Sequence, residues 1–358
     1  MRARRRSIRQ ALTGNASEPW WRLLTIVVCS SPVPSNPDTG TLRASFESLR
    51  VVPGLLRAPK LIQFDGPQPA LPSGRVALYE EFKRRVRKLS QTHRAFARAQ
   101  VYESSTFLFA AHNLAAAVAR VNTSFLLSMQ HDYQLVRPFD APGLLRSMLT
   151  APVVRHVRLN MRSNCPARGF DGVVGNATDL SARGVTVPLT RTCGWSDGPH
   201  VASTHYYRNF CIPLNHGDHN GGRRKFMEES LHYRMQRNFK PGGCWALKQA
   251  VHARSKTHPG PLTIRPHADA SPGELAWPED FDQFGTYLYG VCSPTDGTYT
   301  LHRSLRGNQP QWGLDHRPKQ DLLGGTAPSD ASAHAGRGRR GGRGGRGRAR
   351  GRIGFRNR

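Results

Sequence analysis

Short apolar runs alternate with amphipathic segments through the first half of the chain. The runs lie at 23–29, 60–65, 99–104 and 124–130, and the first and last are almost unbroken. Such runs are typical of interior strands of a sheet that is covered on both faces. The segments between them place apolar residues at helical spacing, which predicts helices at 41–51, 76–90, 109–121 and 142–149. This alternation predicts crossover connections and a mainly parallel α/β sheet flanked by helices.

The second half is less regular. Residues 153–160 alternate like a half-exposed strand, and after about Ser163 glycine, asparagine and proline become frequent. A helix is expected at 225–239 and a strand at 284–291, whereas no periodicity follows Ser304. We therefore expect a disordered basic N-terminus at 1–21, one folded domain at 22–303 with halves 22–162 and 163–303, and a disordered region at 304–358.

The charge of the chain is strongly positive. Its 358 residues carry 52 Lys and Arg against 24 Asp and Glu, a formal charge of +28, and 38% hydrophobic residues suffice for a core. This charge predicts attraction to phosphate groups of nucleic acid, nucleotide or anionic lipid. The tail 336–358 holds ten arginines and no acid; removing ten from +28 leaves +18, so a cationic surface is also expected on the folded part.

Neither a membrane anchor nor a secretory signal is evident in the sequence. The N-terminal apolar run 23–29 has about seven residues, whereas a membrane span needs roughly 17 or more. The basic start is followed by polar residues, unlike a signal peptide. The six cysteines show no C-x-x-C spacing, and most are expected to be small apolar core residues. These features favour the cytoplasm, or the Golgi if the N-terminus is incomplete.

Polar residues follow three of the predicted strands. Cys29-Ser30-Ser31-Pro32 closes the first, Asp65-Gly66 the second, and Gln130-His131-Asp132 the strand at 124–130. Ligand crevices of open α/β sheets lie at the carboxyl ends of their strands. Although Asp-Gly is also a common turn, the coincidence of three such endings predicts a ligand site at this edge.

The order of these elements resembles the GT-A fold of nucleotide-sugar-dependent glycosyltransferases, particularly the family 2 type. The matching residues are TIVVCSSP at the first strand and IQFDG at the second, and the resemblance covers residues 23 to about 292. It implies a nucleotide sugar as donor, with Asp65 and Gly66 at the nucleoside base or ribose. Ser30 and Ser31 would meet the nucleotide through backbone groups.

The resemblance also implies a divalent cation, Mn²⁺ or Mg²⁺, held by a D-x-D motif after the fourth strand. In this chain the motif reads Gln130-His131-Asp132, so only the last acid is kept. Asp132 could hold the ion alone, His131 could join it if the ion is Mn²⁺, or arginines could stabilise the leaving diphosphate instead. Arg155, Arg158 and Arg162 are the candidates for that role; we expect no more than one of them to act, and Arg158 is the choice.

The second half supplies candidate residues for the acceptor and for catalysis. Trp195, Asp197 and His200 lie in a glycine-containing stretch that could hold a sugar ring by stacking and hydrogen bonds, or could form a buried Trp beside an Asx turn. Glu228 and Glu229 begin the helix at 225–239, where the helix dipole alone favours carboxylates. By resemblance, Glu228 takes the proton of the acceptor hydroxyl in an inverting transfer, before Glu229, with Asp197 as the fallback.

The Arg/Gly-rich tail supports a rival hypothesis. Glycine keeps the arginines mobile, so the segment 336–358 could bind RNA or another polyanion. The protein would then be a nucleic-acid-binding factor with the α/β domain as scaffold, although no RNP-like strand or helix-turn-helix pattern is present. The favoured hypothesis is a glycosyltransferase acting on an unknown sugar, lipid or protein acceptor.

Overall fold

The structure is a computed structural model that describes residues 19–162, 164–165, 172–216, 226–237, 247, 250–251, 253, 281–292 and 298–302. All of these residues belong to one compact unit, residues 1–307. The predicted Arg/Gly-rich tail and nearly all of both predicted disordered ends lie outside the described residues.

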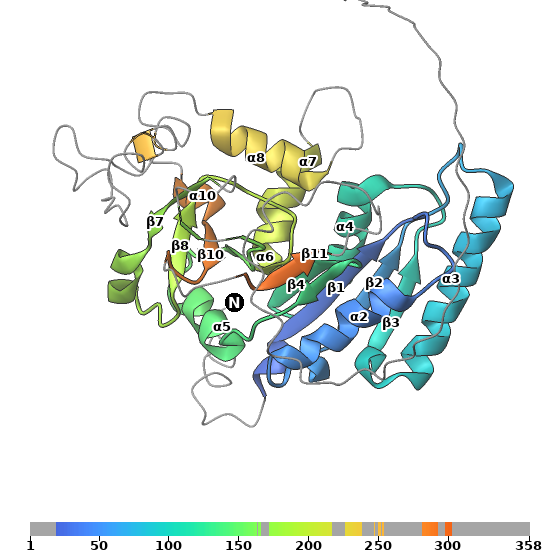
Figure 1. The fold of residues 1–358 in the computed structure, drawn as a ribbon. Coiled ribbons are helices and arrows are strands. Elements are labelled where there is room, and N and C mark those ends of the chain that lie inside the picture. The colour runs from blue at the N-terminus through green and yellow to red at the C-terminus, as the bar shows by residue number, and fades with distance from the viewer. Residues whose placement is uncertain are drawn as a thin grey trace, which may run out of the picture. The chain divides into compact units, whose positions relative to one another are not determined.

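A nine-stranded mixed sheet forms the centre of this unit (Figure 1). β1, β2, β3 and β4 are parallel to one another, and β10 is parallel to β6. β9 runs antiparallel between β4 and β6, and β8 is antiparallel to both β10 and β7. The fold class is therefore the mainly parallel α/β sheet that the sequence predicts. The strands, in their order across the sheet, are β3 (Ala99–Glu103), β2 (Lys60–Phe64), β1 (Leu24–Ser30), β4 (Phe125–Gln130), β9 (His200–Ser203), β6 (His156–Arg158), β10 (Thr286–Tyr289), β8 (Leu189–Thr192) and β7 (Val173–Asn176).

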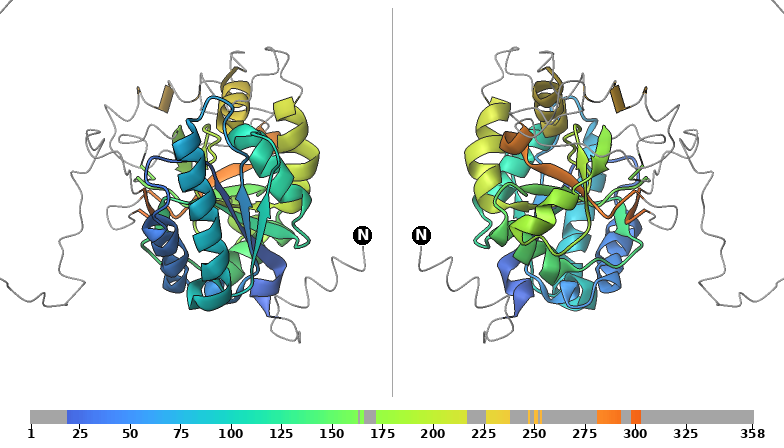
Figure 2. Two further views of the ribbon diagram at one scale, coloured as in Figure 1. Left: turned by 90° about the vertical axis from the view of Figure 1, so that its right-hand side faces the viewer. Right: turned by 90° about the vertical axis from the view of Figure 1, so that its left-hand side faces the viewer.

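The helices of the first half connect these strands and cover the sheet on both faces (Figure 2). α2 connects β1 to β2 and α3 connects β2 to β3, so both crossovers run toward the same edge of the sheet. Because such crossovers are right-handed, both helices lie on one face. α4 connects β3 back to β4 in the opposite direction and therefore lies on the other face. Phe46 of α2 stacks on Phe96 with ring centroids 4.4 Å apart, and Tyr79 of α3 packs edge-on against Phe64 of β2. The helices are α2 (Gly40–Ser48), α3 (Ser73–Thr92), α4 (Phe109–Ala119) and α5 (Ala141–Thr150).

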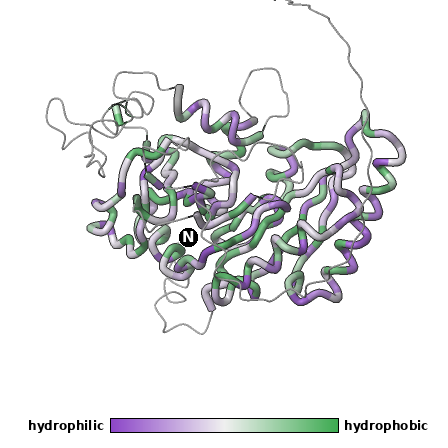
Figure 3. Tube along the Cα trace, in the orientation of Figure 1, coloured by the Kyte–Doolittle hydropathy of each residue, from purple (hydrophilic) through white to green (hydrophobic). Residues whose placement is uncertain are grey.

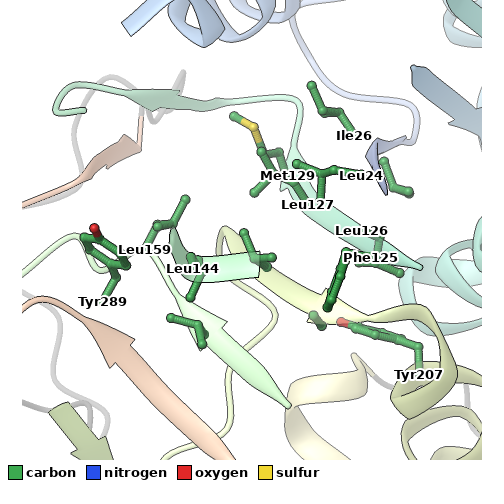
Figure 4. Close-up of a cluster of buried hydrophobic side chains, with 14 of the residues drawn as sticks. Leu24, Ile26, Phe125, Leu126, Leu127, Met129, Leu144, Leu159, Tyr207 and Tyr289 are labelled. Carbon is green, nitrogen blue, oxygen red and sulfur yellow. The ribbon is translucent and has the colours of Figure 1, made fainter. Parts of the chain in front are cut away.

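The hydrophobic core follows the two central strands. Leu24, Ile26, Phe125 and Leu127 are each at most 3% exposed, and they lie together between β1, β4 and the elements around them (Figure 4). Hydrophobic residues accordingly dominate these strands, whereas α3 presents hydrophilic residues along much of its length (Figure 3). Burial on both faces is the reason that these strands are unbroken apolar runs in the sequence.

The segment at 153–160 differs from its prediction. Its strand, β6, is only three residues long, and His156, Val157 and Arg158 are all buried, so the expectation of a half-exposed strand is wrong. β6 lies in the interior of the sheet between β9 and β10. Its polar side chains therefore need internal partners: His156 Nδ1 lies 2.7 Å from Thr286 Oγ1, and Arg158 donates to Gly194 O across 3.1 Å.

Several short elements, most of them in the second half, were not predicted. β7, β8 and β9 complete the sheet, and β5 (Tyr133–Leu135) pairs antiparallel with β11 (Thr300–His302). The strand expected at 284–291 begins only at Thr286, after helix α10 (Phe281–Phe284). The helix expected at 225–239 is confirmed as α8 (Met227–Arg237). Between β9 and α8 lie α6 (Thr204–Tyr206), a π-helical turn (Tyr207–Cys211) and α7 (Ile212–His216).

Disulfides link parts of the chain that are far apart in sequence. Cys165 and Cys292 are bonded across a separation of 127 residues, and Cys193 is disulfide-bonded as well. Cys29 and Cys211 are free. The expectation of mostly unpaired apolar cysteines is therefore wrong for three of them, because spacing in the sequence does not reveal a long-range pairing.

Across the described residues, every helix is too short or too polar to cross a bilayer.

Candidate active site

The carboxyl ends of β1, β2 and β4 meet at one edge of the sheet, called here the carboxyl edge. β1 lies between the other two, with Ser30 opposite Phe64 of β2 and Cys29 opposite Gln130 of β4. Asp65 and His131, which follow these partners directly, therefore leave the sheet at nearly the same level. The register therefore brings the three strand endings together at one edge, as the sequence predicts.

Asp65 is held tightly at this edge. Its side chain is 1% exposed, and its Oδ1 accepts hydrogen bonds from the main-chain N–H groups of Gly66 (2.9 Å) and Leu108 (2.6 Å). The hydroxyl of Tyr79 donates to the main-chain oxygen of Asp65. In this conformation the carboxylate anchors the loop before α4, and its predicted contact with a nucleoside stays a prediction.

Gly66 and the two serines shape the same edge. A Cβ on Gly66 would lie 2.3 Å from the carbonyl carbon of Thr106, so only glycine lets this loop approach so closely. Ser30 is 3% exposed, and its hydroxyl has no hydrogen-bond partner among the described residues. Ser31 is half-buried. Their predicted use of backbone groups toward a nucleotide remains a prediction.

Asp132 has a partner from the end of the folded unit. Its Oδ2 lies 2.9 Å from Nε2 of His302, because β11 pairs with β5 directly after Asp132. Burial by itself would raise the pKa of Asp132, but the hydrogen bond from His302 and the nearby imidazoles lower it. The same bond raises the pKa of His302, whereas burial lowers the pKa of His131.

Asp132 and His302 fit a divalent cation as ligands. Oδ1 of Asp132 is buried and has no hydrogen-bond partner among the described residues, so it can accept a further ligand. A carboxylate oxygen beside an imidazole nitrogen suits Mn²⁺. The described residues contain no ready group of three His, Cys, Asp or Glu side chains for a metal. Substrate phosphates would therefore have to complete the coordination, as they commonly do for such ions.

A second acidic group, Asp197 with Glu228, lies at the start of α8. Oε2 of Glu228 accepts hydrogen bonds from Ser196 Oγ (2.8 Å) and from the main-chain N–H of Asp197 (3.3 Å), and the two carboxyl groups are themselves hydrogen-bonded. α8 begins one residue before Glu228, at Met227, whose side chain is buried. Two carboxyls in contact share a proton, because both cannot easily be ionised.

The environment decides which of the two carries the proton. Burial and the hydrogen bond with Glu228 raise the pKa of Asp197 well above its usual range. Burial would also raise the pKa of Glu228, but hydrogen bonds from Asp197 and Ser196 and the charge of Arg158 lower it. Asp197 is therefore the partner that holds a proton more strongly, and Glu228 is the one that ionises more readily, to the form that can accept a proton.

Tyr133 connects the two acidic groups in space. Burial raises the pKa of its phenol, as do the negative charges of Asp132, Asp197 and Glu228, while Arg158 opposes them. Its ring also packs on the imidazole of His302, with centroids 4.8 Å apart. The carboxyl groups of Asp132, Asp197 and Glu228 therefore all lie near one phenol ring.

Trp195 and His200 are buried in the core, so neither presents its ring at a surface. Both are 0% exposed, and Trp195 stacks on His156 with ring centroids 4.9 Å apart. His200 begins strand β9, where Nδ1 bonds to Gly198 O at 2.6 Å and Nε2 to Tyr207 Oη at 2.5 Å. The structure thus has the buried Trp of the two alternatives. Burial lowers the pKa of His200 to about 4, so its ring is neutral.

The two remaining predicted residues, Glu229 and Arg158, differ in their relation to the acidic pair. Glu229 is exposed on α8, next to Glu228 in sequence, and no contact with the acidic pair is found for it. Arg158 is 8% exposed, with its guanidinium anchored on Gly194 O, so it acts on the acidic pair mainly through its charge. Sequence reasoning missed His302, Ser196 and Tyr133. Only the alternation in TYTLH at 298–302 could have indicated the strand that carries His302.

Neither the known family models nor the curated proteins give a sequence match to this chain. Solved structures similar to it include S. aureus TarS residues 1–349, at 11% identity and a TM-score of 0.32 over 52% of this chain and 48% of that one. Longer S. aureus TarS gives 11% identity and a TM-score of 0.35 over 58% of this chain and 33% of that one. GalNAc-T7 with UDP, GalNAc and Mn²⁺ gives 9% identity and a TM-score of 0.38, over 52% and 36%.

The chain spans less than half the length of each of these solved chains. With TM-scores below 0.5, the likenesses carry no weight for its chemistry. The chain itself has the mainly parallel sheet with flanking helices that the GT-A resemblance predicts. Its activity has to be inferred from its own side chains.

Proposed function

We propose that this protein transfers a sugar from a nucleotide diphosphate sugar to an acceptor hydroxyl, with inversion at the anomeric carbon. The observation that supports this most is the hydrogen-bonded pair of Asp197 and Glu228, in which Asp197 holds a proton more strongly than Glu228. Both carboxyl groups, like that of Asp132, lie near Tyr133. Sugar transfer needs this combination of a base for the acceptor and a separate charged site for the leaving diphosphate.

Glu228 is the proposed general base. The acceptor hydroxyl gives its proton to the ionised carboxylate while its oxygen forms a bond to the anomeric carbon. The bond between that carbon and the diphosphate oxygen breaks, and its electron pair leaves with the diphosphate. Ser196 and Asp197 hold the carboxylate by hydrogen bonds, so that it does not have to reorganise during the step.

The leaving diphosphate is proposed to lie at Asp132 and His302. These residues would hold Mn²⁺, which when bound would offset the negative charge that grows on the leaving group. Arg158 would add positive charge nearby, because its charge acts on Tyr133, the residue after Asp132. The nucleoside is proposed to lie toward Ser31 and Gly66, against the loop that Asp65 anchors. Trp195 and His200 are proposed to support the loop that carries Asp197 from within the core.

A glutamine substitution separates the chemical role of Glu228 from its structural one. Glu228→Gln keeps an oxygen that can accept from Ser196 but removes the base, and we expect the transfer rate to fall about 10²- to 10⁴-fold while binding of the nucleotide product is retained. The rate is measured with a panel of UDP-sugars and Mn²⁺, and binding by calorimetry with UDP.

The matched control is Glu81→Gln, which removes a carboxylate that pairs with Arg84 and Arg85 on the outer face of α3. The transfer rate of this variant should lie within about twofold of the wild-type rate, because such surface pairs contribute little to stability and Glu81 lies outside the proposed site. Full transfer activity in Glu228→Gln, or no turnover of any nucleotide sugar by the folded wild-type chain, would count against the proposal.

The disulfides bear on where the protein works. We infer that the chain matures in an oxidising compartment, because the Cys165–Cys292 bond and the bonded Cys193 would not persist where thiols are kept reduced. This favours the Golgi alternative over the cytoplasm. Alkylation of thiols in freshly lysed cells, followed by peptide mass spectrometry, should find Cys165 and Cys292 protected.

A further inference from the structure

Asn122 is an exposed side chain at the start of the sequence Asn122-Thr123-Ser124. This pattern is the acceptor sequence for asparagine-linked glycans, and acceptors lie on surface segments of secreted proteins. The segment connects α4, which ends at Ala119, to β4, which begins at Phe125. It therefore lies at the amino end of β4.

The main chain on both sides of Asn122 is fixed by contacts with its neighbours. The guanidinium of Arg208 donates to the main-chain oxygens of Val118 (3.0 Å) and Val121 (2.5 Å). On the other side, the main-chain oxygen of Ser124 accepts from the N–H of Thr204 at 3.0 Å. The main chain that carries Asn122 is therefore held in place by the fold, and the residue is exposed there.

This end of the sheet is opposite the candidate active site. Phe125 and Gln130 are the two ends of β4, and five steps of about 3.3 Å put them roughly 17 Å apart. The site residues follow Gln130, whereas Asn122 precedes Phe125. A bulky group on Asn122 would therefore leave the carboxyl edge open.

A second acceptor sequence, Asn176-Ala177-Thr178, has a different environment. Asn176 ends β7 and is half-buried, and its Oδ1 accepts from the main-chain N–H of the disulfide-bonded Cys292 (2.9 Å) and from Thr190 (3.4 Å). Its side chain is part of the packing beside the Cys165–Cys292 bond. A glycan there would compete with these contacts, so the two sequences are not equivalent.

We propose that Asn122 is a site of asparagine-linked glycosylation, an inference that rests on the proposed oxidising compartment. The donor is an oligosaccharide carried on a lipid diphosphate, supplied by the host cell. Nδ2 of Asn122 forms a bond to the anomeric carbon, the bond from that carbon to the lipid diphosphate breaks, and the lipid diphosphate leaves with the electron pair. Nδ2 loses one proton to the solvent.

The test is site mapping in the full chain, expressed in animal cells behind a cleavable secretory leader. Enzymatic removal of asparagine-linked glycans in ¹⁸O water converts each glycosylated asparagine into a labelled aspartate, which peptide mass spectrometry locates. We expect the label at residue 122 in most molecules, and at residue 176 in few or none. Mapping also separates both from Asn15, a third such sequence that lies outside the described residues.

Two substitutions at the acceptor sequence sharpen the result. Ser124→Ala keeps Asn122 but destroys the acceptor sequence, so the label at 122 should disappear. Thr123→Ala changes the neighbouring residue and keeps the acceptor sequence, so the label should persist. An unlabelled Asn122 in secreted wild-type chain overturns the proposal, as does a label at Asn176 that equals or exceeds it.

Discussion

The imidazole of His302 and the carboxylate of Asp132 lie 2.9 Å apart, although 170 residues separate them in the chain. The contact exists because His302 is paired opposite Tyr133 in the two-stranded sheet of β5 and β11. A motif that keeps only one of the two expected acids is therefore joined by an imidazole from another part of the chain, which is the second side chain of the proposed metal site.

We predict that His302→Ala weakens Mn²⁺ binding at least about tenfold, since an imidazole ligand is lost and only one carboxylate remains. Binding is measured with UDP present, by the electron paramagnetic resonance signal of free Mn²⁺, so that the result does not depend on turnover. His205→Ala is the control, because His205 is exposed on α6 and bonds to Asn209. Equal Mn²⁺ affinity in wild type and His302→Ala would remove His302 from the metal site.

The first half of the fold was predictable because its signals are local. Unbroken apolar runs became β1 and β4, and the amphipathic pattern of 76–90 became α3, because these periodicities directly reflect burial on two faces or on one. The endings at Asp65 and Asp132 could also be predicted, since they follow such strands directly.

The rest depends on contacts between distant residues. β9 is four residues long and antiparallel, and nothing local distinguishes it from a loop. Trp195 looks in the sequence like a sugar platform, yet three buried rings surround it, from His156, His200 and Tyr207. The pairing of Cys165 with Cys292 and of Asp132 with His302 is equally invisible, because each joins segments more than 120 residues apart.

The hydroxyl of Ser196 sets the basicity of Glu228. Its hydrogen bond to Oε2 helps to lower the pKa of that carboxyl, so Ser196→Ala should raise this pKa. If Glu228 must be ionised to accept a proton, the acidic limb of the pH–rate profile then moves to higher pH. The profile is measured as kcat against pH, with Ser181→Ala as the control, since Ser181 bonds to Thr178 away from the site. An acidic limb at the same pH in Ser196→Ala and wild type would mean that the ionisation of Glu228 does not control the rate.

Acid should unfold this protein through its buried histidines. Burial lowers the folded-state pKa of His200 to about 4 and that of His156 well below its usual value. Between the ordinary value of about 6.5 and about 4 the unfolded chain binds protons that the folded chain does not, so stability falls as pH falls, by roughly 1.4 kcal/mol per pH unit for each histidine.

Urea unfolding at pH 7 and pH 5 tests this loss. His200→Gln should be less stable than wild type at pH 7, because the bonds to Gly198 and Tyr207 change. It should nevertheless lose less stability on going to pH 5, since one proton-linked group is gone. The same pH dependence in both proteins would mean that His200 is not the group responsible.

The close approach at Gly66 should be intolerant of a single methyl group. In Gly66→Ala the new Cβ would meet main-chain atoms of Thr106 at 2.3–2.5 Å, and the loop that Asp65 holds through Leu108 would have to move. We expect a loss of about 1–3 kcal/mol in unfolding free energy, the usual cost of overpacking, and weaker UDP binding. Gly74→Ala is the matched control: no atom lies within 4 Å of its added Cβ in α3, and replacing glycine in a helix stabilises by about 0.5–1 kcal/mol. Urea unfolding and UDP calorimetry on both variants test this expectation. Equal unfolding free energies of Gly66→Ala and Gly74→Ala would show that the loop near Thr106 moves without cost and that Asp65 does not hold it in place.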